Sequence, residues 1–378
     1  MIRLLHTADV HLGAKFLKDD AVGDKGPTQR EQIKASFKEL ISQAIAEDVD
    51  IVLIAGDLFD SNQQPQSNID LVVEQFGLLA ANNIPICLIP GTHDCFDSGS
   101  TYRKVNFRER CPNLTLFLDE GWNYTEFSAL GLTVYGRPNF SNRSYKSPLE
   151  GLRRLTESQY HIAMAHGSLS IPGVIAEDDY VFTTNQIQNS QMQYVALGHW
   201  HRPYACSDKG VIAWYSGPPE IISTDQKQPG SVLIVTILDS GEVKVEPTQI
   251  GVRCCDEFEI DLSDVESLPE LKNKITEGAN PNLIRRVILK GLRNEDMRPS
   301  LEELEAELSD SFFHLRITDQ SHPRMTELSE DAYKGQLILA KFLKLMKDHI
   351  EACEGEDQGI AEEALQYGLA LLQGKEVI

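Results

Sequence analysis

Acids and histidines recur in this sequence where apolar runs end. The run at residues 51–55, I-V-L-I-A, is short and uninterrupted, which is typical of a strand buried on both faces. Gly56 and Asp57 follow it directly, and Asp60 comes three residues later. Ligands of open α/β sheets bind at the carboxyl ends of strands, which makes Asp57 a candidate for chemistry. A lone Gly-Asp pair is also typical of an ordinary turn, so the inference depends on the other strands.

Four further apolar segments end in the same types of residue. The candidate side chains are Asp9, His11, Asp57, Asp60, Thr92, His93, Asp94, His166, His199 and His201. Together they hold five of the ten histidines in the chain. Neutral imidazoles mixed with carboxylates suit manganese, iron or zinc better than calcium or magnesium alone. Two such ions, about 3.5–4 Å apart, activate water and hold both the attacking and the leaving oxygen of a phosphoryl group, and Asp57 is the natural bridge between them.

The spacing within these motifs supports a shared site. Residues i and i+2 of a strand point to the same side, so Asp9 with His11, and His199 with His201, would each present two ligands if the extended conformation continues past the strand end. Trp200 would then face the opposite side and pack. One such pair also fits a strand that simply ends in polar residues. Five together do not, because burying so many polar groups without partners is costly.

Strands alternate with helices over about the first hundred residues, a pattern that predicts a mostly parallel sheet with helices against it. The predicted strands are residues 2–8, 51–55 and 84–90, and the predicted helices are residues 29–46 and 68–81. Short strands dominate from residue 114, and they predict a second sheet packed on the first. These strands are residues 114–118, 127–135, 160–166, 194–199, 211–215 and 232–238, with one helix near 149–157. The turn Asp239-Ser240-Gly241 predicts a hairpin between 232–238 and 243–245.

The pattern changes again after residue 250. Strands at 258–262, 286–292 and 313–317 alternate with helices at 268–276 and 299–308, the second with Pro299 in its first turn. Residues 327–378 read as helical, and their apolar faces at 337–346 and 364–372 fit partner docking and intramolecular packing equally well. We therefore expect three parts: a catalytic domain at 1–250, a small α/β domain at 251–320 and a helical segment at 321–378.

The net charge of −22 is unusual for a protein that binds nucleic acid, which is expected to be basic. A polyanionic substrate would need local cations, bound metal or a partner. The seven cysteines form no C-x-x-C pair, which argues against a structural zinc site or a disulfide framework. The sequence has neither an apolar run of membrane-spanning length nor a signal-peptide pattern, so we expect no membrane partner and a cytoplasmic location.

Five motifs together carry a family resemblance. They are D-V-H at 9–11, G-D-L-F-D at 56–60, G-T-H-D at 91–94, A-H-G at 165–167 and G-H-W-H at 198–201. They resemble the phosphoesterase motifs of calcineurin-like metallophosphoesterases. Longer matches, H-T-A-D-V-H-L-G at 6–13, G-D-L-F-D-S at 56–61 and Y-S-G-P-P-E at 215–220, resemble the SbcD branch of DNA repair exonucleases and its YhaO-like relatives within the Mre family. The resemblance implies an α/β fold of two packed β-sheets flanked by helices, with a small α+β cap domain and a C-terminal helical segment.

The resemblance also implies roles for the candidate residues. The first metal would be held by Asp9, His11, Asp57 and His201, and the second by Asp57, Thr92, His166 and His199. His93 would contact the scissile phosphate with Asp94 orienting its ring, and Asp60 would support the ligands from behind. The family usually has Asn where this chain has Thr92. An amide oxygen is a better ligand than a neutral hydroxyl, so the second site would be weaker, completed by water or selective for a different metal.

The activity that the resemblance implies is a two-metal DNA exonuclease and endonuclease that processes double-strand breaks. Manganese is the expected metal, with iron, zinc and magnesium as alternatives. The implied partners are DNA, an SMC-like ATPase of the SbcC type that docks the helical segment, and a second copy of the chain. Two groups of basic residues fit either DNA contact or a solvated face: Arg103, Lys104, Arg108 and Arg110, then Arg285, Arg286, Lys290 and Arg293. The alternatives are a phosphodiesterase for nucleotides or another small phosphoester, favoured by the acidic charge, and a scaffold subunit with a site weakened at Thr92.

Overall fold

The computed structural model describes residues 1–15, 25–171, 179–207, 210–293, 300–323, 333 and 335–374. The chain divides into two compact units, Met1–Cys254 and Cys255–Ile378. We call them the first unit and the second unit. The three-part division, with boundaries at 250 and 320, stays a prediction.

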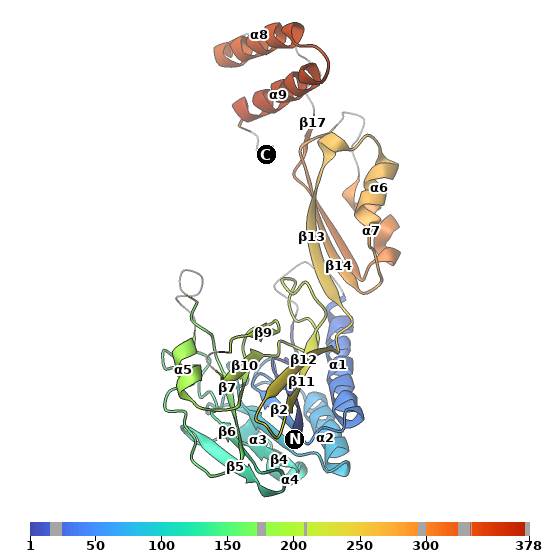
Figure 1. Cartoon of the computed structure of the whole chain (residues 1–378). Helices are drawn as coiled ribbons and strands as arrows, with labels where there is room; N and C mark the ends of the chain where they lie inside the picture. The colour runs from blue at the N-terminus through green and yellow to red at the C-terminus, as the bar shows by residue number, and fades with distance from the viewer. Residues whose placement is uncertain are drawn as a thin grey trace. The chain divides into compact units, whose positions relative to one another are not determined.

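One six-stranded sheet of the first unit has the order β12, β11, β1, β2, β3, β4. The strands are β1 (Ile2–Thr7), β2 (Ile51–Ala55), β3 (Ile86–Ile89), β4 (Leu114–Leu116), β11 (Ser231–Ile237) and β12 (Val243–Gln249). β1 to β4 are parallel, and β11 pairs antiparallel with both β1 and β12. Helices α1 (Gly26–Ala46) and α2 (Gln66–Ala81) lie side by side against this sheet, with Phe37 and Phe76 in one apolar core with strand residues (Figure 1).

The second six-stranded sheet has the order β5, β6, β7, β8, β10, β9. Its strands are β5 (Asn123–Phe127), β6 (Leu132–Gly136), β7 (Tyr160–His166), β8 (Tyr194–Gly198), β9 (Tyr204–Ala205) and β10 (Ile212–Tyr215). Leu4 and Leu53 of the first sheet share a buried core with Val134 and Ile162 of the second. The predicted pair of packed sheets is therefore confirmed, and burial of both inner faces stabilises it. Ile187 of α5 (Thr184–Asn189) belongs to the core on the outer face of the second sheet.

Three expectations for the first unit are wrong. β4 and β11 pair in the first sheet rather than the second, because strand partners are chosen by contacts remote in sequence. The strand expected at 127–135 is a hairpin of β5 and β6, bent at the 3₁₀ turn Ser128–Leu130 and at Gly131, whose φ is +60°. Residues 149–157 form turns and bends instead of a helix. The predicted hairpin at Asp239-Ser240-Gly241 is confirmed.

The second unit contains the predicted alternation of strands and helices. A three-stranded sheet, in the order β13, β14, β16, is accompanied by two helices. The elements are β13 (Cys254–Asp261), α6 (Leu268–Thr276), β14 (Leu283–Lys290), α7 (Leu301–Leu308) and β16 (His314–Asp319). The sequence did not predict a two-stranded pair of β15 (Leu292–Arg293) and β17 (His322–Pro323). The predicted helix start at Pro299 lies outside the described residues.

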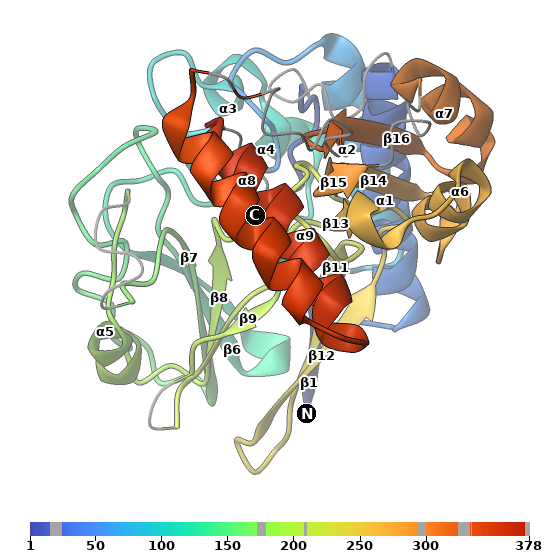
Figure 2. The ribbon, with the colours of Figure 1, turned by 90° about the horizontal axis from the view of Figure 1, so that it is seen from above.

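Helices α8 (Leu337–Ala352) and α9 (Glu356–Leu372) complete the second unit and lie side by side (Figure 1), and α8 overlaps α9 when they are seen from above (Figure 2). Leu343 and Leu369 are fully buried in the core of this hairpin. Over the part of the chain that the structure describes, no helix is long and apolar enough to cross a membrane.

Candidate metal centre

The ends of strands from both sheets meet at one place in the first unit. His166 ends β7 of the second sheet, and its Nδ1–H donates a hydrogen bond to the carbonyl of Ala55, the last residue of β2 in the first sheet, at 2.9 Å. Gly56 makes this approach possible, because a Cβ there would lie 2.3 Å from His166 Nδ1. The glycine before Asp57 is therefore required by close packing as well as by its φ of +96°.

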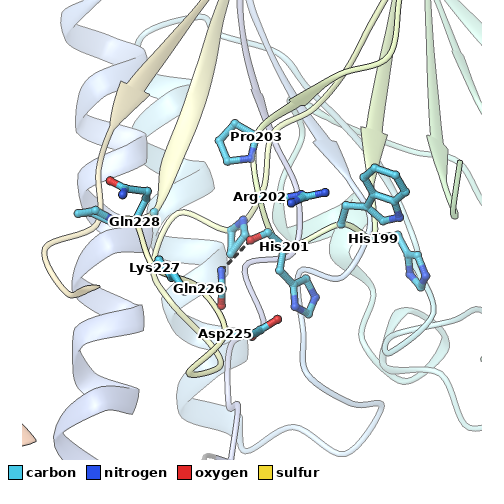
Figure 3. Close-up of a pocket in the computed structure, with 12 residues that line it drawn as sticks. His199, His201, Arg202, Pro203, Asp225, Gln226, Lys227 and Gln228 are labelled. Carbon is cyan, nitrogen blue, oxygen red and sulfur yellow. Dashed lines mark hydrogen bonds between the residues drawn. The ribbon is translucent and has the colours of Figure 1, made fainter. Parts of the chain in front are cut away.

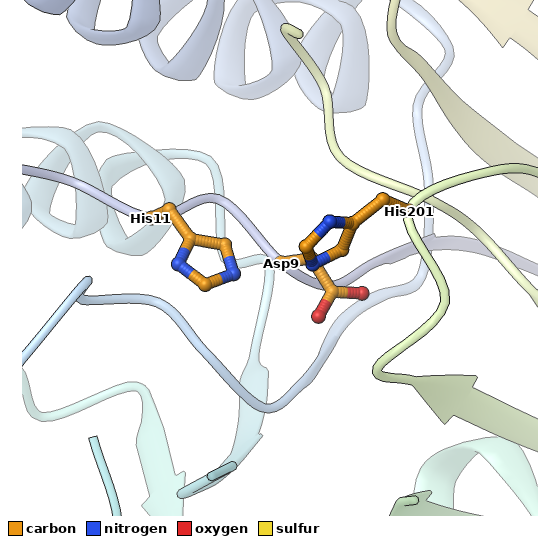
Figure 4. Close-up of side chains that lie close together, drawn as sticks. All are labelled: Asp9, His11 and His201. Carbon is orange, nitrogen blue, oxygen red and sulfur yellow. The ribbon is translucent and has the colours of Figure 1, made fainter. Parts of the chain in front are cut away.

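Five of the seven predicted ligands gather in overlapping groups. The groups are Asp9, His11 and His201, shown in Figure 4, then His11, Asp57 and His93, and then Asp9, Asp57 and His166. Within each group the potential ligand atoms all lie within 4.8 Å of one another. The other two predicted ligands adjoin these groups. Thr92 Oγ1 lies 3.4 Å from His166 Nε2, and the ring centroid of His199 lies 5.3 Å from that of His166.

Asp57 lies at the centre of the cluster. Its Oδ1 accepts a hydrogen bond from the backbone N–H of His93 at 2.8 Å, and its Oδ2 accepts one from Thr92 Oγ1 at 3.2 Å. Burial raises the pKa of this carboxyl, but the neighbouring imidazoles, His166 first, hold it well below its usual range. Burial in turn lowers the pKa of His166, whereas the charge of Asp57, 3.2 Å away, raises it to about 9. Asp57 is therefore an ionised carboxylate that attracts positive charge.

His11 has one ring nitrogen in place for a metal ion. Its Nδ1 lies 3.1 Å from Asp60 Oδ1, the position expected for Asp60 as a support behind the ligands. Its Nε2 is buried and makes no hydrogen bond to any residue in the described ranges, although Asp57 Oδ2 lies 3.7 Å away. Burial lowers the pKa of His201 to about 4, so this ring is neutral near pH 7, whereas His166 must give up the proton that Asp57 favours before its ring can bind a metal ion. These carboxylates and imidazoles fit a divalent transition-metal ion.

The backbone at the predicted ligands is not extended. The expectation that Asp9 with His11, and His199 with His201, point to the same side assumed an extended backbone past the strand ends. The φ angle is +54° at Asp9, +50° at His11, +52° at Asp57 and +109° at His199. Asp and His enter the left-handed region more readily than most residues, but the conformation is uncommon outside glycine. The turn at Asp9 lets its carboxylate accept the backbone N–H of His199, at 3.0 Å to each oxygen. The two loops are therefore joined directly.

His93 lies at the exposed edge of the cluster, with 49% of its side chain accessible. Its Nδ1–H donates to the backbone carbonyl of Asp60 at 3.1 Å, and its ring centroid is 4.6 Å from that of His11. The expectation that Asp94 orients this ring is wrong, because the ring is held by Asp60.

Asp94 instead joins two loops beneath the cluster. It is fully buried and accepts hydrogen bonds from Gly91 N–H at 2.7 Å, Phe59 N–H at 3.1 Å and the Tyr102 hydroxyl at 2.6 Å. Burial, assisted by the charge of Asp57, raises its pKa to about 6. Asp94 thus fixes the loop after β3 against the loop after β2.

Sequence reasoning missed a stacked pair that ties the ligand loops together. Trp200 and Tyr215 stack with ring centroids 4.7 Å apart and planes 8° apart. The indole N–H of Trp200 donates to Ser168 Oγ at 3.0 Å, and the Tyr215 hydroxyl donates to the carbonyl of Gly167 at 2.8 Å. Trp200 lies between two predicted ligands and Gly167 follows a third. The aromatic residues inside G-H-W-H and Y-S-G-P-P-E were the available signal.

The family follows from this site and from direct comparison. Residues 2–203 match the calcineurin-like phosphoesterase family, and because this match spans more than half of the 378 residues, the chain belongs to that family. It is therefore a metal-dependent phosphoesterase, a hydrolase.

Two kinds of individual protein are similar to this chain over most of its length. The metallophosphoesterase YhaO of Bacillus subtilis (strain 168) is 23% identical over 357 residues, which cover 89% of this chain and 86% of that protein. The DNA double-strand break repair protein Mre11 of Aeropyrum pernix is 27% identical over 294 residues, which cover 72% of this chain and 67% of that protein. The DNA double-strand break repair protein Mre11 of Sulfolobus acidocaldarius is 24% identical over an alignment of 397 residues, which covers 97% of this chain and 98% of that protein. This similarity fits the Mre-like proteins broadly and does not single out the SbcD branch.

Proposed function

We propose that this chain is a DNA nuclease that hydrolyses phosphodiesters with two divalent metal ions and acts in double-strand break processing. The observation that carries the proposal is the set of overlapping Asp and His groups centred on Asp57. The names of the Mre11 relatives support DNA as the substrate. A place in the SbcD branch, with a cytoplasmic location, is part of the proposal.

The residues fit two metal positions that share Asp57. Asp9, His11, Asp57 and His201 would hold the first ion, and Asp57, Thr92, His166 and His199 the second. Mixed oxygen and nitrogen donors make manganese our choice of metal. When bound, the ions activate water and neutralise charge on the phosphoryl oxygens.

The other residues of the site would orient the substrate and move a proton. His93 Nδ1–H is occupied by the carbonyl of Asp60, so Nε2 is the ring atom left to exchange a proton with the leaving oxygen. The exposure of this ring places it where a substrate can reach it. Asp60 contacts both His11 and His93 and thereby fixes their relative orientation. Asp94, which contacts neither ring, acts as a positioning residue for the loop that bears His93.

The four basic residues of the second unit that the sequence offered for DNA contact, Arg285, Arg286, Lys290 and Arg293, contribute little to DNA binding in this proposal. Each has a carboxylate partner: Arg285 with Asp256, Arg286 with Glu257, Lys290 with Glu259 and Arg293 with Asp319. Arg285 is also only 5% exposed. Such pairs stabilise neighbouring strands. Positive charge for DNA would therefore have to come from other basic residues, from the metal ions or from a partner.

The helical hairpin is our candidate for docking an SbcC-type ATPase. Leu339, Leu343, Leu365 and Leu369 are buried between α8 and α9, as intramolecular packing requires. A second set of large apolar side chains on these helices is exposed: Leu337, Ile338, Leu345, Ile360, Leu371 and Leu372. An apolar helix face of this kind suits docking against a partner helix. A homodimer formed through the catalytic domain also stays a proposal.

A nuclease assay on DNA with defined ends tests the proposed function. Wild-type protein and His93→Leu are compared with Mn²⁺, Mg²⁺, Fe²⁺ and Zn²⁺, alone and with the ATPase partner. We expect metal-dependent cutting by wild type, with cutting lost and metal binding retained in His93→Leu. Failure of wild type to cut single- or double-stranded DNA under every condition, with hydrolysis of bis(4-nitrophenyl) phosphate retained, would refute the nuclease.

That last outcome would support a phosphodiesterase for a small substrate. The net charge of −22 favours this second function, because a long polyanion is repelled by an acidic chain whereas a nucleotide carries few charges. The two functions differ in their response to salt. DNA cutting should weaken steeply with rising salt, and small-ester hydrolysis should hardly change.

A further inference from the structure

A cleft of about 730 Å³ opens beside the candidate metal centre in the first unit (Figure 3). Its near wall contains the predicted ligands His199 and His201, and its far wall is the segment 225–230. Arg202 and Lys227 also line it. Small-molecule sites typically enclose about 300–1,000 Å³, so the cleft is large enough for a nucleotide.

The far wall is fixed relative to the metal centre. Gln226 is only 7% exposed, and its Nε2–H donates to the backbone carbonyl of His201 at 3.0 Å. Its Oε1 accepts the backbone N–H groups of Ile222 at 2.7 Å and Ser223 at 3.0 Å. The amide of Gln226 therefore ties the far wall to the loop that bears His201.

The two cations of the cleft, Arg202 and Lys227, differ from the basic residues of β14 in their lack of an acidic partner among the described residues. The guanidinium carbon of Arg202 lies 5.9 Å from the ring centroid of Trp200 and 5.6 Å from that of Tyr204, which orients an exposed side chain. Within the described ranges, neither Arg202 nor Lys227 has an acidic side chain within 4.0 Å. The carboxylate of Asp225 also lines the cleft, and it accepts a hydrogen bond from Ser223 Oγ.

We propose that this cleft binds a phosphate group that flanks the scissile phosphodiester. The inference rests on the proposed function, since it takes the scissile phosphate to lie at the cluster around Asp57. A neighbouring phosphate of the same strand would then enter the cleft past His199 and His201. The guanidinium of Arg202 supplies two parallel N–H donors for phosphate oxygens, and Lys227 supplies a second positive charge. The site therefore selects nucleic acid strands over diesters that lack a second phosphate.

Dinucleotides with and without a terminal phosphate test this directly. The probes are thymidylyl-thymidine, the same compound with a 5′ phosphate, and the same compound with a 3′ phosphate. Values of kcat/KM are measured with Mn²⁺ for wild type, Arg202→Gln, Arg202→Lys and Lys227→Gln. Lys244→Gln is the matched control, because Lys244 is an exposed cation on β12 that does not line the cleft. Dissociation constants for the same probes are measured in a His93→Leu background, so that affinity is read without turnover.

We expect one terminal phosphate, at the 5′ or the 3′ end, to improve kcat/KM of wild type and the affinity of His93→Leu about tenfold, the effect of one charged hydrogen bond. Arg202→Gln should reduce this advantage to less than about threefold, with Arg202→Lys between the two and Lys244→Gln equal to wild type. The end that gives the advantage identifies the side of the scissile bond that enters the cleft. Equal affinity with and without the phosphate in His93→Leu protein that keeps Arg202, or an advantage retained in Arg202→Gln, would overturn the proposal. The affinity pattern with no cutting of single- or double-stranded DNA by wild type would refute the nuclease and leave the phosphate site standing.

Discussion

Removing the hydroxyl of Tyr215 should weaken metal binding although Tyr215 is not a predicted ligand. Its hydroxyl donates to the carbonyl of Gly167 at 2.8 Å, and its side chain is fully buried. Tyr215→Phe keeps the ring that stacks on Trp200 and leaves the buried carbonyl without this donor. Such a loss costs about 1–3 kcal/mol. Since Gly167 follows His166 directly, we expect the affinity for Mn²⁺ to fall about 10- to 100-fold, as it does when groups that orient metal ligands are removed.

Urea unfolding in EDTA and calorimetric titration with Mn²⁺ measure the two effects separately. The three tryptophans, Trp122, Trp200 and Trp214, all lie in the first unit, so their fluorescence reports on that unit alone. The matched control is Tyr124→Phe, since Tyr124 is 45% exposed and its loss should change the free energy of unfolding by less than about 0.5 kcal/mol. If Tyr215→Phe binds Mn²⁺ as tightly as Tyr124→Phe does, the stacked pair does not position the ligands.

Three further predictions concern the buried His6, the closely packed Gly91, and Thr92, which stands where the family usually has Asn. Burial lowers the pKa of His6 to about 3, so the folded state binds fewer protons than the unfolded state below pH 6.5. The stability that this shift contributes is complete above pH 6.5 and is lost as pH falls, by about 2 kcal/mol at pH 5. Urea unfolding in EDTA at a series of pH values should therefore show the free energy of unfolding falling more steeply with decreasing pH in wild type than in His6→Gln. Gly91→Ala should abolish Mn²⁺ binding in calorimetry, because its Cβ would lie 2.3 Å from Asp57 Oδ1, whereas Gly77→Ala, with nothing within 4 Å, should be neutral or stabilising. Thr92→Asn should bind the second Mn²⁺ more tightly and hydrolyse bis(4-nitrophenyl) phosphate faster, and unchanged values would show that the hydroxyl is an adequate substitute.

The sequence predicted where the chemistry lies better than it predicted how the sheets are built. Apolar runs such as 51–55 identify buried strands by local pattern, and the polar residues after them mark the strand ends. Which strands pair depends on contacts between residues far apart in the chain. β11, for example, pairs with β1 although more than 200 residues separate them, and no local pattern predicts that pairing.

The roles of individual polar residues were harder to infer than their location. Asp94 follows His93 directly, so spacing suggested that one orients the other. The backbone instead turns Asp94 inward to Tyr102, and His93 meets the carbonyl of Asp60. The left-handed angles at Asp9 and Asp57 were likewise invisible, because sequence pattern predicts extended or helical backbone and these residues adopt neither.

Those left-handed residues set a limit on how this enzyme can be engineered. A side chain in that region of backbone space costs on the order of 1 kcal/mol, which glycine would recover. At Asp9, His11, Asp57 and His199 the costly residue is also a candidate ligand. At Asp9 and Asp57, however, glycine would also leave the backbone N–H groups of His199 and His93 without their carboxylate acceptors, at a cost of about 1–3 kcal/mol each. Selection for heat resistance alone would therefore keep these two carboxylates even without a demand for turnover.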